Sequence, residues 1–298
     1  MVSHPQERNP MLWGMCQATE DQHVSTSPIV ANIPCYAQPY SDLTHGMDIP
    51  GMKLSGGKIG THSDLRAATY SGISCQVNQS DYGNTRKGNK NKKKEVPSLK
   101  IGTWNVRTMN KPSKRENLEV EMEKHNIDIL GLGEIRWPGE GETTIGDYTM
   151  IYKGGEKKER GVGFIFKKKL DKNIIKIIPK SDRIIAMKIR SYPVDTLIIQ
   201  VYMPTSEADD EDVEEVYKQI EEILDENGKG QVRSLIIGDW NSVVGEGREG
   251  NIVGNYGYGR RNERGDKLVE FCGQYDYWIS NTWFEQPKRR LYTWKNPG

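Results

Sequence analysis

The chain has 298 residues, 35% of them hydrophobic, and a formal net charge of +1. That length is enough for one large domain plus additional material, because single domains rarely exceed about 250 residues. The net charge attracts neither nucleic acid nor membrane by itself, so a function that needs either partner has to rest on local patterning. No apolar run approaches the roughly 20 residues that span a bilayer, so we expect no membrane partner.

The four cysteines are widely scattered and show no metal-ligand or redox spacing, which favours a reducing compartment. Residues 1–8 lack the apolar core of a secretory signal. We therefore expect a nuclear protein, with the cytoplasm as the alternative location. The sequence does not indicate an oligomeric state.

Residues 1–98 show no sustained period of 2 or 3.6, and Gly, Ser, Asn, Thr, Asp and Pro recur throughout. This composition predicts a disordered segment. It ends in a basic run at residues 86–94, which is either a solvated linker or a patch for nuclear import or phosphate attraction.

Residues 99–298 are predicted to form one ordered domain. Ser113 and Glu116 fit a capping box, which predicts a helix from there to about His125. Two amphipathic helices follow at about 210–225 and 265–275. Apolar and alternating segments predict strands at 99–104, 128–132, 148–152, 162–166, 174–178, 184–189, 196–202, 235–239, 277–282 and 290–294.

Several of these strands follow one another without intervening helices. That order disfavours a singly wound parallel sheet. It favours an α/β (α+β) four-layer sandwich, in which two packed, mostly antiparallel sheets are flanked by helices.

Polar side chains stand where separate predicted strands end, namely Asn105, Glu134, Tyr202, Asp239 and Asn241. Carboxylate and amide oxygens without His or Cys suit a hard cation such as Mg²⁺, which takes few protein ligands. A phosphodiester is hard to attack because it is negatively charged. A cation that neutralises its oxygens, together with a polar group that orients water, makes the attack easier. The alternative is that all five residues only shape turns and caps.

Eight short motifs in one order resemble the endonuclease/exonuclease/phosphatase superfamily. The resemblance is closer to the apurinic-type endonuclease of non-LTR retrotransposons and to the craniofacial development protein 2-like proteins that share it. The motifs are Thr-Trp-Asn at 103–105, Gly-Leu-Gly-Glu-Ile-Arg-Trp at 131–137, Gly-Val-Gly-Phe at 161–164, Ser-Asp-Arg at 181–183, Tyr-Met-Pro at 202–204, Gly-Asp-Trp-Asn at 238–241, Asn-Glu-Arg-Gly at 262–265 and Tyr-Thr-Trp at 292–294.

The resemblance implies a DNA endonuclease that uses Mg²⁺, with Mn²⁺ as a possible substitute. It assigns Glu134 as the metal ligand with Asn105 beside it. It assigns Asp239 to activating the attacking water, Asn241 to holding the phosphate, and Tyr202 to contacting the scissile phosphate.

The same resemblance suggests residues that contact the DNA substrate. Arg183 and Asn262 are expected on the DNA-facing rim, and Arg136 and Trp137 are expected to steer the DNA backbone. Arg260 and Arg261 fit the same role, although solvated loop charges explain them equally well.

The family pattern continues past the Tyr-Thr-Trp motif to an Asp-containing strand and a terminal Ser-Asp-His. This sequence ends at Gly298 and has no histidine after His125. We therefore expect a domain without its C-terminal strands and with weak or no activity, because a missing donor to developing charge typically costs about 10² to 10³ in rate. Two other functions remain open, a non-catalytic remnant or binding protein and a phosphatase of small phosphoesters.

Overall fold

The computed structural model describes residues 11–13, 29–32, 69–70, 99–191 and 194–286. The predicted strand at 290–294, the basic run at 86–94 and Gly298 lie outside these described residues. Three expectations stay predictions. They are the division of the chain at residue 98, the nuclear location and the weak or absent activity.

Two β-sheets carry the fold. The first has the order β13-β1-β12-β11-β10-β9 and the second the order β3-β2-β4-β5-β8-β7-β6. The strands of the first sheet are β1 (Met11–Trp13), β9 (Ile174–Pro179), β10 (Ile184–Ile189), β11 (Asp195–Tyr202), β12 (Val232–Asp239) and β13 (Tyr277–Ile279). Those of the second are β2 (Ile29–Asn32), β3 (Thr69–Tyr70), β4 (Lys100–Asn105), β5 (Ile129–Gly133), β6 (Glu140–Ile145), β7 (Tyr148–Lys153) and β8 (Val162–Lys167).

Both sheets are mixed. The pairs β4/β5 and β11/β12 are parallel, and the strands β5, β8, β7 and β6 form an antiparallel succession, as do β11, β10 and β9. Parallel partners need a crossover, and α1 (Pro112–His125) and α2 (Asp210–Asn227) supply it. The predicted α+β sandwich is confirmed.

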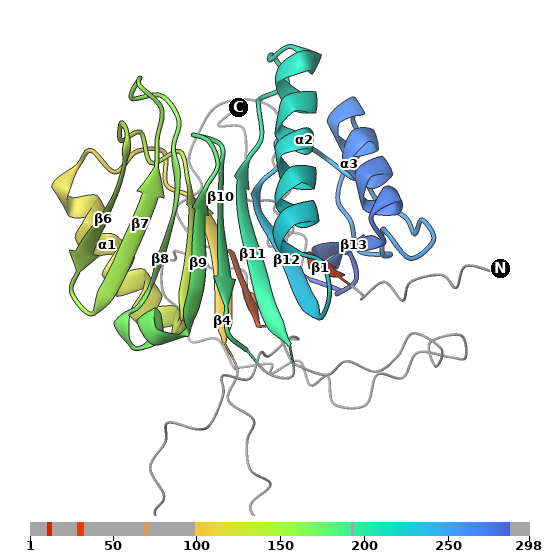
Figure 1. Ribbon diagram of the computed structural model, residues 1–298. Coiled ribbons are helices and arrows are strands. Elements are labelled where there is room, and N and C mark those ends of the chain that lie inside the picture. Colours follow the sequence, from red (N-terminus) through yellow and green to blue (C-terminus); the bar gives the residue numbers. More distant parts are fainter. Residues whose placement is uncertain (1–10, 14–28, 33–68, 71–98, 192–193, 287–298) are drawn as a thin grey trace, which may run out of the picture.

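Figure 1 shows the two sheets and the helices beside them. Three apolar clusters hold these layers together. Ile198, Leu235 and Phe164 belong to the cluster between the two sheets. The outer face of the first sheet packs against α2 and α3 (Glu263–Gln274), and the outer face of the second packs against α1. Apolar residues of β11 and β12 therefore point both ways, which is why these strands read as continuous apolar runs.

Several predicted boundaries change. Ser113 lies inside α1, whose N-cap is Lys111 without a side-chain capping bond, so the predicted capping box is wrong. Pro112 supplies the start instead, because proline fixes a helical φ at the first position. The strand β6 was not predicted, because Glu140–Ile145 is largely exposed and polar. The last described strand ends at Ile279 and continues as a 3₁₀ turn, Ser280–Thr282.

Three short strands, β1, β2 and β3, come from the first 98 residues and join the sheets next to β12, β13 and β4. The remaining residues of that segment lie outside the described part of the chain. Within the described residues, no helix is long and apolar enough to cross a bilayer.

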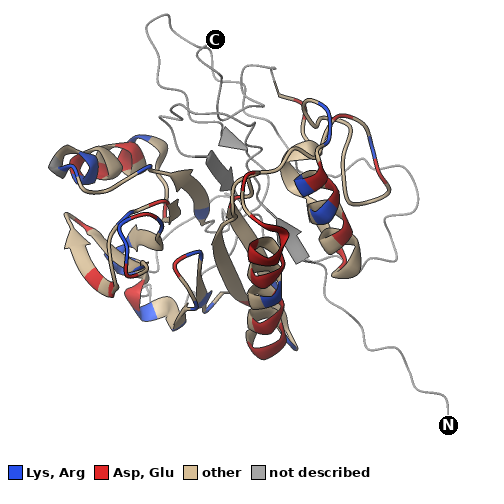
Figure 2. Ribbon diagram, turned by 90° about the horizontal axis from the view of Figure 1, so that it is seen from above, with Lys and Arg blue, Asp and Glu red and all other residues tan. Residues whose placement is uncertain are grey.

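Charges are unevenly distributed over the helices. The exposed side of α2 carries mostly Asp and Glu, which colour that helix predominantly red in Figure 2. Its buried residues include Val213, Val216, Ile220 and Leu224, the stripe that the sequence predicted. Lys180 and Lys267 form ion pairs with Glu222 and Glu214 of this helix. The acidic face is therefore engaged by neighbouring elements of the same domain.

Candidate active site

Four strand ends meet at one rim of the sandwich. Asn105 ends β4, and it pairs in register with Gly133 at the end of β5. In the other sheet, Tyr202 ends β11 and pairs with Asp239 at the end of β12. Because both pairs are parallel, each sheet brings two carboxyl ends side by side, where polar side chains collect.

A hydrogen bond joins the two halves of this rim. The Asn105 Nδ2 donates to Asp239 Oδ2 over 2.8 Å, although the two residues are 134 positions apart. The Asn105 Oδ1 accepts from the backbone N–H of Arg107 at 3.1 Å, which fixes the orientation of the amide. Arg107 itself has a φ of 55°, so a tight turn directly after the strand shapes this part of the site.

Glu134 follows β5 directly and is buried, with 9% of its surface exposed. Both Glu134 and Arg136 adopt left-handed backbone conformations, at φ of 57° and 61°. Non-glycine residues rarely do so, and such strain is concentrated at functional sites. The Arg136 guanidinium bonds Glu134 Oε1 through Nε at 3.0 Å and also through a terminal nitrogen. The loop thus places a carboxylate and a cation together.

The electrostatics of Asp239 and Tyr202 show that Glu134 is near both. Burial raises the pKa of the Asp239 carboxyl, the bonds from Asn105 and the Asn241 backbone oppose that shift, and the negative charge of Glu134 adds to it. Burial, followed by the charges of Glu134 and Asp239, raises the pKa of Tyr202 to about 12. Tyr202 is therefore a protonated hydrogen-bond donor at neutral pH.

Asn241 completes the group at the same rim. Its φ of 44° turns the chain just after β12. The backbone N–H donates to Asp239 Oδ1 at 3.3 Å, and Nδ2 donates to the carbonyl of Met203 at 2.8 Å. The side chain is therefore tied to the loop that follows Tyr202.

Arg183 supports Tyr202 from the bend directly before β10. Its Nη1 donates to the Tyr202 carbonyl at 3.2 Å, and the guanidinium lies 5.5 Å from the centre of the Tyr202 ring. Burial and then the neighbouring charge of Arg160 lower the pKa of this arginine. Arg160 itself forms an ion pair with Asp182 at 3.7 Å, next to Arg183 in the sequence.

Trp137 stands beside the Glu134 loop and is half-buried. Its ring meets the Tyr152 ring edge-on at 5.1 Å, and the Arg115 guanidinium lies 4.8 Å from its centre. These contacts hold the indole in place, as a platform for a ligand or as part of the loop packing.

Asn262 and the neighbouring arginines have other structural partners. The Asn262 Oδ1 accepts from the backbone N–H of Gly265 at 2.9 Å, which caps α3, and from that of Val243 at 3.0 Å. Arg261 donates to the Val244 carbonyl and pairs with Glu249. Arg260 is exposed. The structure gives Asn262 and Arg261 a role in fixing the loop after β12.

The donor set fits a hard divalent cation. Among the described residues, no three His, Cys, Asp or Glu side chains are grouped as metal ligands. Two carboxylates, Glu134 and Asp239, and the amide of Asn105 gather instead. Mg²⁺ is usually held by one or two carboxylates and keeps several waters. A cation would also offset the burial, and after it the charge of Glu134, that raise the pKa of Asp239.

Two further polar residues escaped the sequence prediction. Gln200 and Thr103 lie buried between the sheets beneath the rim, at 0% and 4% exposure. The signal was present, because Gln200 interrupts the otherwise apolar run Leu197, Ile198, Ile199 and Val201. Arg107 was also missed, although it stands only two positions after Asn105.

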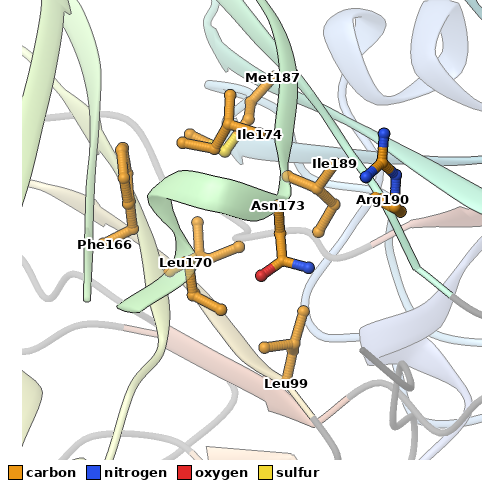
Figure 3. Close-up of a pocket in the computed structure, with 9 residues that line it drawn as sticks. Leu99, Phe166, Leu170, Asn173, Ile174, Met187, Ile189 and Arg190 are labelled. Atoms are coloured by element: carbon orange, nitrogen blue, oxygen red, sulfur yellow. The ribbon is translucent and has the colours of Figure 1, made fainter. Parts of the chain in front are cut away.

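Figure 3 shows a small cavity of about 10 Å³. Its lining includes Leu99, before β4, and Ile129, the first residue of β5, so it lies at the ends of these strands that are away from Asn105 and Gly133. Leu99, Phe166, Leu170 and Met187 give it an apolar lining, with the amide of Asn173 at one side. It has room for roughly one water molecule. This cavity is unsuited to a phosphoester, so the rim around Asp239 is the functional candidate.

The fold is an α+β sandwich that gathers two carboxylates, an amide and a tyrosine hydroxyl at one rim, and these groups are chemically suited to act on a phosphoester bond. The chain belongs to the Endonuclease/Exonuclease/phosphatase family, which matches residues 102–292.

Two curated relatives and one solved structure are similar to this chain. Craniofacial development protein 2 from Bos taurus is 42% identical over 198 residues, which are 66% of this chain and 33% of that protein. The protein of the same name from Tragulus javanicus is 41% identical over 198 residues, 66% of this chain and 34% of that protein. The chain thus spans about a third of the length of these curated relatives. The endonuclease domain of TRAS1, a telomere-specific non-LTR retrotransposon, is 17% identical with a TM-score of 0.38, covering 59% of this chain and 69% of that one.

Proposed function

We propose that this chain is a divalent-cation-dependent DNA endonuclease domain. The observation that carries the proposal is the meeting of Asn105, Glu134, Tyr202 and Asp239 from two sheets at one rim. Such a convergence of strained, buried and mutually perturbed polar groups is typical of catalytic sites.

Glu134 and Asn105 would hold Mg²⁺ or Mn²⁺. When bound, the cation neutralises the charge on the phosphate oxygens. Asp239 accepts the proton of the attacking water. Its raised pKa makes it a stronger base than an exposed aspartate, provided that it is ionised at the working pH.

The remaining polar groups bind and orient the phosphate. The Tyr202 hydroxyl, with a pKa of about 12, donates a hydrogen bond to a phosphate oxygen. Asn241, held by the Met203 carbonyl, offers its second amide hydrogen to the same group.

The cations around the rim favour a polyanionic substrate over a small phosphoester. Arg136 lies beside Glu134, and the Arg183 guanidinium lies 5.5 Å from the centre of the Tyr202 ring. Arg107 follows Asn105 by two residues and donates its backbone N–H to the Asn105 side chain. Several arginines along one rim contact successive phosphates of a nucleic acid strand, while a small phosphoester needs only one or two. A nuclear location belongs to this proposal, and a fluorescent fusion of the full chain tests it.

The test is nicking of supercoiled plasmid by the full chain with Mg²⁺, with Mn²⁺ and with a chelator. We expect cation-dependent nicking that falls at least about 100-fold when Glu134→Ala and Asp239→Ala are combined. The matched control combines Glu214→Ala and Asp225→Ala, which also removes two negative charges but from exposed positions on α2. Nicking that survives in the first pair overturns the assignment.

Two other outcomes select the remaining functions. Phosphate release from sugar or nucleotide phosphates without any nicking identifies a small-phosphoester phosphatase. Tight plasmid binding without cleavage under any cation identifies a non-catalytic binding protein.

A further inference from the structure

A buried polar contact lies directly beneath the rim. The Thr103 Oγ1 donates to Gln200 Oε1 at 2.9 Å, and the Gln200 Nε2 donates to the Val201 carbonyl at 3.2 Å. Thr103 is 4% exposed and Gln200 is fully buried. The contact joins β4 of one sheet to β11 of the other through the middle of an apolar layer.

The strand register places this contact one step below the candidate active site. Thr103 precedes Asn105 by two residues on β4, and Gln200 precedes Tyr202 by two residues on β11. Residues two apart on a strand share a face. Thr103 therefore lies beneath Asn105, and Gln200 lies beneath Tyr202. The Thr103–Gln200 hydrogen bond therefore joins the two sheets two residues below the Asn105–Asp239 hydrogen bond, which joins them at the rim.

Strand β5 leaves room for the glutamine because it has a glycine at position 131. A Cβ atom at Gly131 would lie 1.9 Å from Gln200 Oε1, and one at Gly133 would lie 3.9 Å from Tyr202 Cδ2. Gly131 pairs with Thr103, and Gly133 pairs with Asn105. Gln200 therefore lies directly against the backbone of β5 at Gly131, whereas a side chain at Gly133 would make only ordinary contacts with Tyr202.

Filling space does not explain this pair. An apolar side chain of the same length would occupy the gap without the cost of burying an amide and a hydroxyl. A hydrogen bond adds what apolar contact lacks, which is a fixed direction and a fixed distance between two strands. Catalytic groups need that precision, since a displacement of about 1 Å can lower a rate by about 100-fold.

We propose that Gln200, held by Thr103, is a positioning residue that sets the spacing of the two sheets at the active site. The pair holds Asn105 and Tyr202 at the separation at which Asn105 reaches Asp239. This inference rests on the proposed function for its kinetic consequence, but its geometric consequence is independent of it.

The test compares Thr103→Val, Gln200→Met and the double variant in the full chain. Each single change leaves a buried partner unsatisfied, so we expect both to lower thermal stability and activity. The double variant replaces both partners by groups of the same shape, and we expect its melting temperature to return close to that of the wild type. Its kcat for plasmid nicking should stay about 10- to 100-fold low, with KM within about threefold of the wild type, because the rim arginines are untouched.

The conservative variant Thr103→Ser keeps the hydroxyl and should retain kcat within about threefold. A double variant that regains wild-type kcat together with its stability overturns the proposal, since the pair would then only fill and hold the core. A crystal structure of the double variant gives the geometric readout. We expect the Asn105 Nδ2 to Asp239 Oδ2 distance to exceed hydrogen-bonding range, and an unchanged distance also overturns the proposal. If the wild type shows no nicking, the proposed function fails and this distance alone decides the inference.

Discussion

Replacing Asp239 by asparagine separates the catalytic role of this carboxylate from its effect on stability. The side chain keeps its size but loses its charge. In the wild type one oxygen accepts from Asn105 at 2.8 Å and the other from the Asn241 backbone at 3.3 Å. An asparagine has one carbonyl oxygen and can keep only one of these bonds. We expect it to lose the longer bond, from the Asn241 backbone, which lowers the free energy of unfolding by about 0.5–1.5 kcal/mol.

The opposite contribution comes from the raised pKa of Asp239. A carboxyl whose folded pKa lies above its unfolded value stabilises the fold below the unfolded pKa, and this contribution is lost as pH rises through the folded pKa. Each unit of elevation corresponds to about 1.4 kcal/mol. The wild type loses stability when Asp239 ionises, and the Asp239→Asn variant does not, because asparagine has no proton to lose. The free energy of unfolding of the variant should therefore increase relative to that of the wild type as pH rises.

Urea unfolding at several values between about pH 4 and pH 8 measures this difference, and plasmid nicking measures activity on the same samples. We expect the variant to gain stability with pH while nicking falls by about 10² to 10³. Asp225→Asn on the exposed face of α2 controls for the loss of one negative charge. A stability difference that does not change with pH refutes the electrostatic reasoning, and undiminished nicking refutes the role of Asp239 in catalysis.

Three further changes test single contacts. Tyr202→Phe removes the donor hydroxyl, and we expect kcat to fall by about 10- to 100-fold with little change in the urea midpoint, measured by steady-state nicking. Gly131→Ala places a methyl group 1.9 Å from Gln200 Oε1, and we expect about 1–3 kcal/mol of destabilisation in urea unfolding together with a loss of nicking. Asn262→Ala removes the cap of α3 and the bond to Val243, and we expect a loss of about 1–2 kcal/mol, which Asn262→Asp should largely restore.

Each of these changes has an outcome that contradicts its reasoning. A Tyr202→Phe enzyme with wild-type kcat shows that the hydroxyl does not touch the phosphate. A stable, active Gly131→Ala variant shows that the sheets tolerate a side chain beneath the rim. If Asn262→Ala weakens plasmid binding without lowering stability, Asn262 contacts DNA as the sequence resemblance implied, rather than only capping α3.

The sequence predicted those parts of the site that stand at the ends of strands. Asn105, Tyr202 and Asp239 each follow an apolar run, and the parallel pairing of their strands brings such ends together. The contact between Asn105 and Asp239 was beyond sequence reasoning, because it depends on how closely two sheets pack. For the same reason the roles of Gln200 and Thr103 emerged only from the structure.

The fold prediction succeeded where burial dictates the pattern and failed where local chemistry does. Strand β11 and helix α2 have continuous apolar runs or stripes, and both lie within two residues of their predicted bounds. The capping box at Ser113 failed because Pro112 offers a competing helix start one residue earlier. Strand β6 was missed because its pairing with β7 is made by backbone groups, with largely exposed polar side chains.

The bond between Asn105 and Asp239 also has a consequence for how the protein matures. During synthesis, the nascent chain exposes Asn105, Glu134 and Tyr202 long before Asp239 leaves the ribosome. A proteolytic fragment that ends before β12 therefore carries Asn105, Glu134 and Tyr202 but lacks Asp239, which bonds Asn105 across the two sheets. Only a chain that extends through β12 can form the bond that joins the two sheets at the rim.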